Sequence, residues 1–454
     1  MNIYDSVLDM IGRTPLLKIN NFDTGPCELY LKLELLNPGG SVKDRIGLSM
    51  IDEAEKRGDL KPGDTIVEAT AGNTGIGLSL VAALRNYHLV LVLPDKMSQE
   101  KIFNLRAMGA EIIITRSDVA KGHPEYYQDL AERIAKERGA YYINQFGNPD
   151  NPKAHEETTA PELWEQMDER LDAVVLGVGT SGTITGITNY FKNIGEKVEM
   201  VLADPEGSVL VEYVHTGKLE AKGSWLVEGI GEDFIPEIAD MSAISSAYSI
   251  SDAESFATAR ELLNREGVLA GSSTGTLLAA ALRYCREQTD PKRVVTLACD
   301  TGNRYLSKLY NDFWMEDQGF IERPPTGNLL DLIGRPHEQQ ATITVGPTDV
   351  LTTAHNRLRN AGISQLPVMD DDRLVGVLTE DDIIRHVFGQ PALMKSPVAE
   401  AMHTAFVSVD KDMPLNTLVS ILQAQPYAAV NDGDQFLGLI TRSDMLNHLR
   451  KQVH

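Results

Sequence analysis

The sequence contains few cysteines and no long apolar run. Its three cysteines, Cys27, Cys285 and Cys299, form no Cys-x-x-Cys pair and leave an odd one over. Such usage is typical of a reducing compartment and indicates buried or idle thiols rather than a metal site. No apolar run is long enough to cross a bilayer, and the start, Met-Asn-Ile-Tyr-Asp, lacks the pattern of a signal peptide. We therefore expect a cytoplasmic protein without bound metal.

Basic residues are also scarce. The sequence has 42 Lys and Arg residues and 65 Asp and Glu residues, which gives a formal net charge of −23. Nucleic acids and anionic membranes attract proteins with a basic face, so we expect neither as a partner. Small anionic ligands must then be held locally, by helix starts and glycine-lined loops.

The sequence does contain a regular alternation of strands, glycine-rich turns and helices. Strands are expected at 64–69, 88–94, 108–115, 171–178 and 293–300, with helical stretches between them. This alternation predicts an α/β fold whose parallel sheet is covered by helices on both faces. Ligands of open parallel sheets bind beyond the carboxyl ends of the strands, which is where the glycine-rich turns fall.

One lysine stands where a glycine-rich loop runs into a predicted helix, in the segment Asn-Pro-Gly-Gly-Ser-Val-Lys-Asp-Arg at 37–45. Lys43 is the candidate nucleophile, because an amine whose pKa is lowered by burial or by a cation such as Arg45 can form a Schiff base. By itself the segment is more typical of an exposed lysine in a turn. The rest of the chain reverses that preference.

The loop at 177–183, Gly-Val-Gly-Thr-Ser-Gly-Thr, matches the dinucleotide fingerprint G-x-G-x-x-G, and Asp204 stands near the position of a ribose-binding acid. A nicotinamide-dependent dehydrogenase is therefore one hypothesis. A single phosphate held by backbone N–H groups and by hydroxyls explains the loop equally well. The chain also carries a second such loop, at 70–77, and the lysine segment, which is more than a dehydrogenase needs.

The chain repeats itself beyond a Pro- and Gly-rich boundary near 320–335. Residues 374–383 return at 436–445 with the same spacing of Gly, Thr and Asp, and 344–351 return at 408–415. The Thr-x-x-Asp motifs are capping boxes, which are structural in themselves. We expect a catalytic domain at 1–325, a linker at 326–341 and repeats at 342–391 and 396–454.

In their motifs and the order of these motifs, residues 1–320 resemble the fold-type II pyridoxal-phosphate enzymes of the cysteine synthase and cystathionine β-synthase family. The resemblance implies two open parallel-sheet subdomains and pyridoxal phosphate as the cofactor. Lys43 would hold the cofactor covalently, Asn73 would meet its ring hydroxyl and Ser273 its pyridine nitrogen. The residues implied for its phosphate are Gly179, Thr180, Ser181, Gly182 and Thr183. Those implied for the substrate carboxylate are Thr70, Ala71, Gly72, Asn73, Thr74 and Gln145, although family members usually have Ser at position 71.

The family offers two reactions. One replaces the hydroxyl of L-serine by L-homocysteine to give L-cystathionine, with hydrogen sulfide production when cysteine is used. The other, cysteine synthesis, replaces the acetate of O-acetylserine by sulfide. The appended repeat and Asp233 favour the first reaction. Glu232 and Asp233 are candidate homocysteine contacts, and Glu232 stands where animal enzymes commonly have tyrosine.

The repeat resembles a pair of the small domains named after cystathionine β-synthase, or Bateman module. In related modules the Thr and Asp of the repeated motif meet adenosine compounds. The resemblance thus implies S-adenosylmethionine or an adenine nucleotide at Thr379 and Asp382 or at Thr441 and Asp444. It also implies a homodimer or higher homo-oligomer, and no haem, because the animal haem segment has no counterpart. The alternative from another class is a nucleotide-sensing scaffold without activity.

Overall fold

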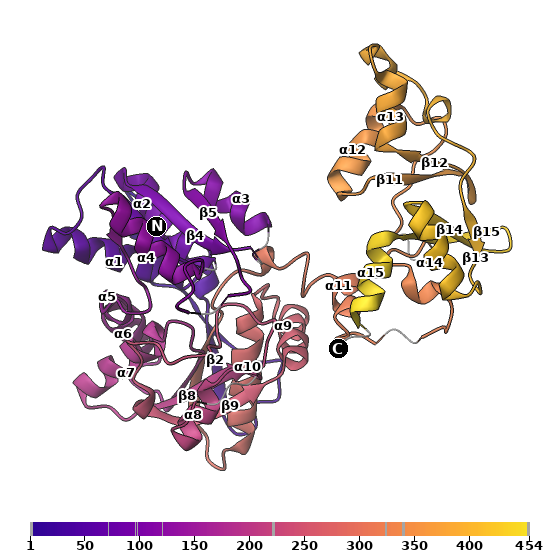
Figure 1. Cartoon of the computed structure of the whole chain (residues 1–454). Coiled ribbons are helices and arrows are strands. Elements are labelled where there is room, and N and C mark those ends of the chain that lie inside the picture. The colour runs from indigo at the N-terminus through magenta and orange to yellow at the C-terminus, as the bar shows by residue number, and fades with distance from the viewer. Residues whose placement is uncertain are drawn as a thin grey trace. The chain divides into compact units, whose positions relative to one another are not determined.

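The computed structural model describes residues 3–70, 72–95, 97, 99–119, 121–219, 223–322, 325–337 and 341–451. The chain forms two compact units, Met1–Asn311 and Asp312–His454 (Figure 1). Among the described residues, no helix is long and apolar enough to cross a lipid bilayer.

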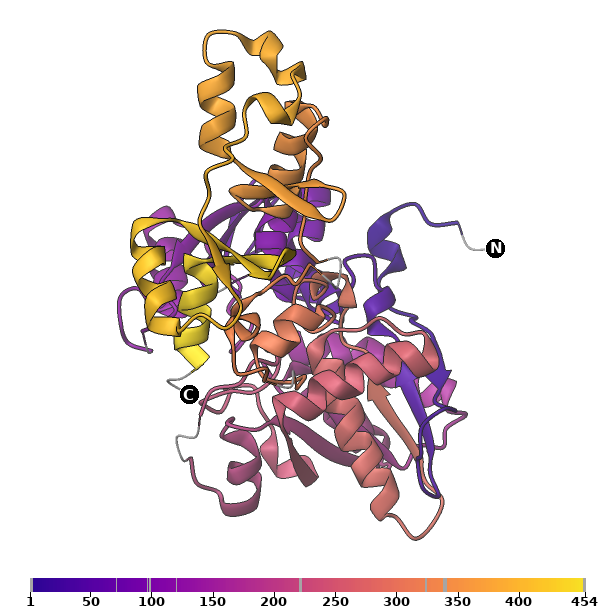
Figure 2. The same ribbon diagram turned by 90° about the vertical axis from the view of Figure 1, so that its right-hand side faces the viewer.

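The described part of the first unit contains two sheets. The larger has six strands in the order β1-β2-β10-β7-β8-β9, all parallel except the pair β1 and β2. The smaller has four parallel strands in the order β5-β4-β3-β6. Parallel neighbours need long crossovers, which helices supply here (Figure 1, Figure 2). The predicted α/β fold with two parallel-sheet subdomains is confirmed.

The strands of the first unit are β1 (Leu16–Lys18), β2 (Glu28–Lys32), β3 (Thr65–Ala69), β4 (His88–Pro94), β5 (Glu111–Thr115), β6 (Tyr141–Tyr142), β7 (Ala173–Leu176), β8 (Glu199–Pro205), β9 (Ile244–Ile250) and β10 (Arg293–Leu297). Its helices are α1 (Lys43–Arg57), α2 (Asn73–Arg85), α3 (Gln99–Ala107), α4 (Tyr127–Arg138), α5 (Asp150–Ala154), α6 (Ala160–Gln166), α7 (Gly182–Ile194), α8 (Leu210–Thr216), α9 (Asp252–Glu266) and α10 (Ser272–Glu287). All five predicted strands are present. The strand expected from residue 108 begins only at Glu111, because Gly109 at φ +89° forms the turn that follows α3.

Helix packing explains the apolar sequence of the central strands. Helix α10 packs against β7, β8, β9 and β10, while α2 and α4 pack against strands of the smaller sheet. Every residue of β7 is buried, as expected for a parallel strand with both faces covered.

The second unit begins with α11 (Asp312–Asp317), and the repeated part follows it. Its first half contains α12 (Leu351–Ala361), β11 (Gln365–Asp370), β12 (Arg373–Thr379) and α13 (Glu380–Val387). Its second half contains β13 (Ser408–Asp410), α14 (Leu415–Ala424), β14 (Tyr427–Asp432), β15 (Gln435–Thr441) and α15 (Arg442–Lys451). The hairpins β11-β12 and β14-β15 share one register, with Gln365 opposite Thr379 and Tyr427 opposite Thr441. The repeat seen in the sequence is therefore a repeat of structure.

A short segment before the first half packs into the core of the second half. Leu329, Leu332 and Ile333 are buried among Val409, Leu418 and other apolar side chains of that half. A Cβ atom at Gly438 would lie 2.6 Å from Ile333 Cγ2, so a glycine is needed where this segment crosses β15. The segment at 329–333, which leads into the first half, is thus part of the core of the second half.

Candidate active site

Lys43 is the first residue of α1, as predicted. The helix has no side-chain cap at its start, where the Lys43 N–H donates to Ser41 Oγ at 3.2 Å. Helix α2 crosses this first turn closely, since a Cβ atom at Gly77 would lie 2.6 Å from the Lys43 carbonyl oxygen. Only glycine allows this approach, which brings the start of α2 towards Lys43.

The Lys43 amine lies in a desolvated position. Burial lowers its pKa below the ordinary lysine value, and the nearby Cys299 and Glu232 oppose that shift only in part. No described residue accepts a hydrogen bond from this amine. Arg45 does not supply the expected help, because its guanidinium is bound to Glu34 at 2.8 Å and to Glu162 at 2.7 Å. The uncharged, nucleophilic form of Lys43 is thus favoured by burial.

The loop between β7 and α7 forms a cradle lined by small residues. A Cβ atom at Gly182 would lie 1.9 Å from Asn151 Oδ1, and one at Gly179 would lie 2.6 Å from the Gly229 carbonyl oxygen. Asn151 also donates to Thr180 Oγ1 at 3.0 Å. Ser181 has φ +68°, and its buried hydroxyl has no hydrogen-bond partner. An orphaned hydroxyl at an uncapped helix start fits a phosphate group.

Behind this cradle lies His155, a residue that the sequence did not single out. It begins a π-helical turn, His155–Thr159, and is fully buried. Its Nε2 lies 3.2 Å from Thr183 Oγ1 and its Nδ1 lies 2.9 Å from Thr159 Oγ1. Burial, together with the charges of Lys43 and Arg45, lowers the pKa of His155 to about 3. The ring is therefore neutral and orients the Thr183 hydroxyl without adding charge.

The predicted substrate loop lies between β3 and α2. The structure brings together Gln145 and Thr74, whose Oγ1 donates to Gln145 Oε1 at 2.6 Å. Thr70 Oγ1 accepts from the Gly72 N–H at 3.2 Å, and Gly72 has φ +154°. Ala71 lies outside the described residues. Helix α2 also starts without a side-chain cap, so its first N–H groups are available to a carboxylate.

Asn73 is held from two sides. Its Nδ2 donates to Asp300 Oδ2 at 2.8 Å, and its Oδ1 accepts from Arg304 Nη1. Arg304 Nη2 donates to the Gly39 carbonyl in the lysine loop. Asp300 is fully buried and also accepts from Tyr305 at 2.8 Å. The amide that was expected to face a ring hydroxyl is thus fixed in orientation.

Ser273 lies buried in the first turn of α10, beside Cys299. Burial raises the pKa of the Cys299 thiol to about 12, and Lys43 and Ser273 oppose this shift only in part. The thiol is therefore protonated at neutral pH and is a poor nucleophile. This agrees with the prediction of an idle cysteine.

The acidic segment 228–234 forms a rim near Lys43. Glu232 is half-buried and close enough to Lys43 and Tyr127 to shift their pKa values, whereas Asp233 is exposed and acts on Tyr126. Glu228 binds Lys101 and, at 2.6 Å, Lys308.

No sequence pattern points to the roles of Lys101, Glu228, Asp300 and Arg304, because each has a partner that lies far away along the chain. Asp204, the acid of the dehydrogenase hypothesis, is 1% exposed and accepts from the Val211 N–H at 3.3 Å. One carboxylate oxygen of Asp204 thus binds the first turn of α8, while its Oδ1 is buried without a hydrogen-bond partner among the described residues. Among the described residues, no group of three or more His, Cys, Asp or Glu side chains could hold a metal ion.

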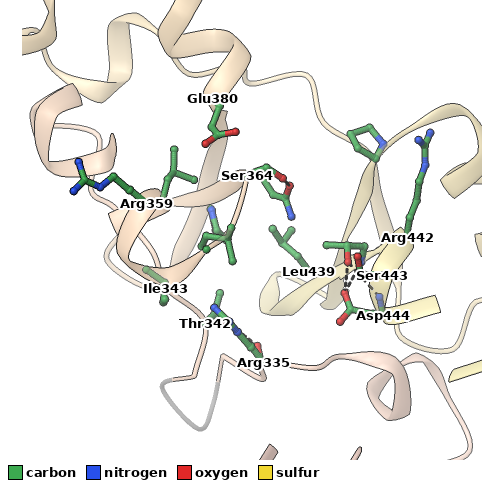
Figure 3. A pocket seen from close by; sticks show the side chains of 17 residues that line it. Arg335, Thr342, Ile343, Arg359, Ser364, Glu380, Leu439, Arg442, Ser443 and Asp444 are labelled. Carbon is green, nitrogen blue, oxygen red and sulfur yellow. Dashed lines mark hydrogen bonds between the residues drawn. The ribbon is translucent and has the colours of Figure 1, made fainter. Parts of the chain in front are cut away.

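The second unit contains a pocket of about 790 Å³ between the two halves of the repeat (Figure 3). Thr441 and Asp444 line it, together with Gln365 and Glu380. The other predicted pair, Thr379 and Asp382, does not. Both pairs form their capping boxes, with Asp382 Oδ2 and Asp444 Oδ2 each 2.6 Å from the threonine hydroxyl of its own motif.

Comparisons with known proteins agree with this geometry. Residues 7–300 match the family "Pyridoxal-phosphate dependent enzyme", and residues 339–389 and 398–451 each match the CBS domain. A cystathionine beta-synthase of Dictyostelium discoideum is 36% identical over 99% of this chain and 93% of its own length. A cysteine synthase A of Salmonella typhi is 40% identical, but over only 70% of this chain and 98% of its own.

The same comparison extends to solved structures. An O-acetylserine dependent cystathionine beta-synthase from Helicobacter pylori is 38% identical and superposes with a TM-score of 0.63, covering 68% of this chain and 99% of the other. The resemblance seen in the sequence is confirmed, and the lysine, the cradle and the uncapped helix start fit pyridoxal phosphate. The chain belongs to the cystathionine beta-synthase family of pyridoxal-phosphate dependent enzymes.

Proposed function

We propose that this enzyme replaces the hydroxyl of L-serine by the thiol of L-homocysteine, releasing water and forming L-cystathionine. One observation carries the proposal. The similarity to cystathionine beta-synthase continues through the CBS pair over 99% of the chain, whereas the similarity to cysteine synthase A covers only 70%. Lys43, at the meeting point of the cradle and the substrate loop, supports it.

Each part of the site has one task in this reaction. The cradle at 179–183 binds the phosphate of the cofactor, with Thr183 oriented by His155. The N–H groups at the start of α2 bind the substrate carboxylate, with Thr70, Thr74 and Gln145 beside them. Asn73 would hold the ring hydroxyl, and Ser273, which is neutral, would hold the pyridine nitrogen.

Pyridoxal phosphate, when bound, supplies a carbonyl for the substrate amine and an electron sink that acidifies its α-hydrogen. Lys43 Nζ would take that α-proton, because burial lowers its pKa and so favours its basic form. The same amine returns a proton to the product carbon. Glu232 and Asp233 on the rim face the amino group of homocysteine, as an anion faces a cation.

A second candidate differs in the leaving group. The Helicobacter pylori relative is named as O-acetylserine dependent, so acetate could leave here in place of water. The purified enzyme should be given serine or O-acetylserine with homocysteine, and O-acetylserine with sulfide. Cystathionine formed from serine supports the proposal. Cysteine formed from O-acetylserine and sulfide, with no cystathionine from serine, would replace it with cysteine synthesis.

We further propose that the CBS pair binds an adenosine ligand that regulates the enzyme, and that the enzyme is a cytoplasmic homodimer or higher homo-oligomer without haem. The pocket at Thr441 and Asp444 supports the ligand, since carboxylates accept hydrogen bonds from ribose hydroxyls. Binding of S-adenosylmethionine, AMP and ATP to the full-length protein tests this directly.

A further inference from the structure

A lysine of α3 packs directly over the start of α2, where the substrate carboxylate is expected. Lys101 is only 4% exposed. A Cβ atom at Gly72 would lie 3.3 Å from Lys101 Cδ and 3.5 Å from Lys101 Nζ. Gly72 is the N-cap residue of α2, which has no side-chain cap. The ammonium group therefore lies beside the positive end of a helix, which is unfavourable for a cation unless an anion lies close by.

One such anion comes from the other subdomain. Glu228 lies between α8 and β9, on the side of the larger sheet, and pairs with Lys101 and, at 2.6 Å, with Lys308. Its backbone N–H donates to Ser272 Oγ at 3.0 Å, at the start of α10. Burial raises the pKa of the Glu228 carboxyl, but the two lysines outweigh burial and hold this pKa below its ordinary value. Glu228 is thus a fixed, charged partner, and its pair with Lys101 joins the two subdomains beside the substrate loop.

The charges around the start of α2 do not cancel. The cations are Lys101, Lys308 and Arg304, and the acids linked to them are Glu228 and Asp300. Burial also raises the pKa of Asp300, which favours its neutral form. Positive charge is therefore in excess at a loop that is expected to receive a carboxylate.

Tyr305 connects Lys101 with the contacts that hold Asn73. Lys101 Nζ lies 5.3 Å from the centre of the Tyr305 ring. The Tyr305 hydroxyl donates to Asp300 Oδ2 at 2.8 Å, and Asn73 Nδ2 donates to the same oxygen at 2.8 Å. Connected side chains thus hold both Gly72 and Asn73, the two residues at which α2 begins.

We propose that Lys101, held in place by Glu228, is a positioning residue for the α-carboxylate of the amino-acid substrate. Its side chain fixes the loop at Gly72, and its charge attracts the carboxylate to the first N–H groups of α2. The inference rests on the function proposed above and adds a side chain of α3 to the substrate site. Lys308 pairs with the same carboxylate but follows β10, so it has no such role.

Equilibrium titration of the full-length holoenzyme with L-serine, in the absence of homocysteine, tests this role. Serine binding is followed by the visible absorption of the bound cofactor. Lys101→Met should raise the Kd for serine at least tenfold and Glu228→Gln at least fivefold, whereas cofactor content should not change. The matched control Lys308→Met should stay within twofold of the parent. Lys101→Arg should restore the Kd to within threefold, because a guanidinium can also pair with Glu228.

Thermal unfolding shows which variants are folded, and Glu228→Gln carries the test if Lys101→Met does not fold. An unchanged Kd in folded Lys101→Met would overturn the proposal. Equal weakening by Lys101→Met and Lys308→Met would assign the effect to net charge alone, and tighter binding by Glu228→Gln would contradict the role of the pair.

The same titrations with O-acetylserine separate this inference from the proposed reaction, because O-acetylserine carries the same carboxylate. A parent enzyme that binds O-acetylserine but not serine would overturn the proposed reaction. The comparison of the variants with O-acetylserine would then still decide the role of Lys101. Binding of neither compound to the parent would overturn both.

Discussion

Arg304 donates a hydrogen bond to the side-chain oxygen of Asn73, although the two residues belong to different subdomains. Arg304 follows β10 of the larger sheet, and Asn73 begins α2 after β3 of the smaller one. The second arm of the guanidinium reaches the Gly39 carbonyl in the loop before Lys43. One side chain thus fixes the distance between the lysine loop and the loop expected to meet cofactor and substrate.

Arg304→Gln should therefore disturb Asn73 without unfolding the chain. Loss of a charge-assisted hydrogen bond costs about 1.5–3 kcal/mol, which corresponds to about a 10- to 100-fold loss of kcat/KM. The visible absorption of the bound cofactor should shift as well, because Asn73 would lose its fixed orientation. Arg138→Gln, at an arginine paired with Glu111 on the surface at 2.9 Å, is the control. An unchanged spectrum with reduced stability would make Arg304 a purely structural residue.

Lys43→Ala should abolish turnover, by at least about a thousandfold, because the amine has both a covalent and a proton-transfer role. The variant should remain folded by circular dichroism, since Lys43 is not packed in the apolar core. Borohydride reduction followed by peptide mapping should label Lys43 in the parent enzyme. Lys56→Ala, at a surface lysine paired with Glu53, is the matched control. Labelling of another lysine would contradict the assignment.

Neutralising an acidic side chain of the segment 228–234 should impair the use of homocysteine but not the activation of serine. If Glu232 or Asp233 contacts the amino group of homocysteine, Glu232→Gln or Asp233→Asn should raise the KM for homocysteine about tenfold, the effect of about 1.4 kcal/mol. In Asp233→Asn, exchange of the serine α-hydrogen with deuterium from solvent should continue at its normal rate, because Lys43 performs that step. Equal losses in both measurements would assign the segment to folding or closure.

The buried carboxyl of Glu68 should make stability pH-dependent. Burial raises its pKa to about 8, so the folded chain keeps a proton that the unfolded chain releases above about pH 4.5. This contribution to stability is complete below about pH 4.5 and is lost towards pH 8, at up to about 1.4 kcal/mol per pH unit.

Glu68→Gln cannot ionise, so its free energy of unfolding in urea should fall less than that of the parent as pH rises. Glu111→Gln serves as the control, because the pKa of Glu111 is lowered by Arg138 and lies below this range. Parallel curves for the parent and Glu68→Gln would show that Glu68 is already ionised in the folded chain.

Truncation after Asn311, at the boundary of the two compact units, should leave a yellow, active enzyme. Lys43, the cradle, Ser273 and Arg304 all precede this point. A truncation near residue 330 should be less soluble, because it exposes Leu329, which the core of the second half buries in the full chain. Cofactor absorbance and cystathionine formation measure both variants. Loss of the cofactor after the first cut would show that the second unit completes the site.

Local sequence patterns determine much of the secondary structure of this protein and the positions of its motifs. The strands β3, β4 and β7, the start of α1 at Lys43 and the two capping boxes follow from apolar spacing, glycine-rich turns and Thr-x-x-Asp, all of which act within a few residues. The family resemblance supplied the candidate cofactor and substrate loops. These elements and loops can be predicted from the sequence because they depend on residues that are close together along the chain.

Only the tertiary structure shows which charged side chains are bound to other residues of the protein and which remain available to a ligand. Arg45 looked available to Lys43 but is bound to Glu34 and Glu162, and Asp204 looked like a ribose ligand but accepts a hydrogen bond from the first turn of α8. His155 and Arg304 acquire their roles through contacts across 28 and 231 residues. Thr379-x-x-Asp and Thr441-x-x-Asp are the same motif in the sequence, yet Asp382 is hydrogen-bonded to His403 whereas Asp444 lines a pocket. Only folding could distinguish them, because the residues around each motif come from distant parts of the repeat.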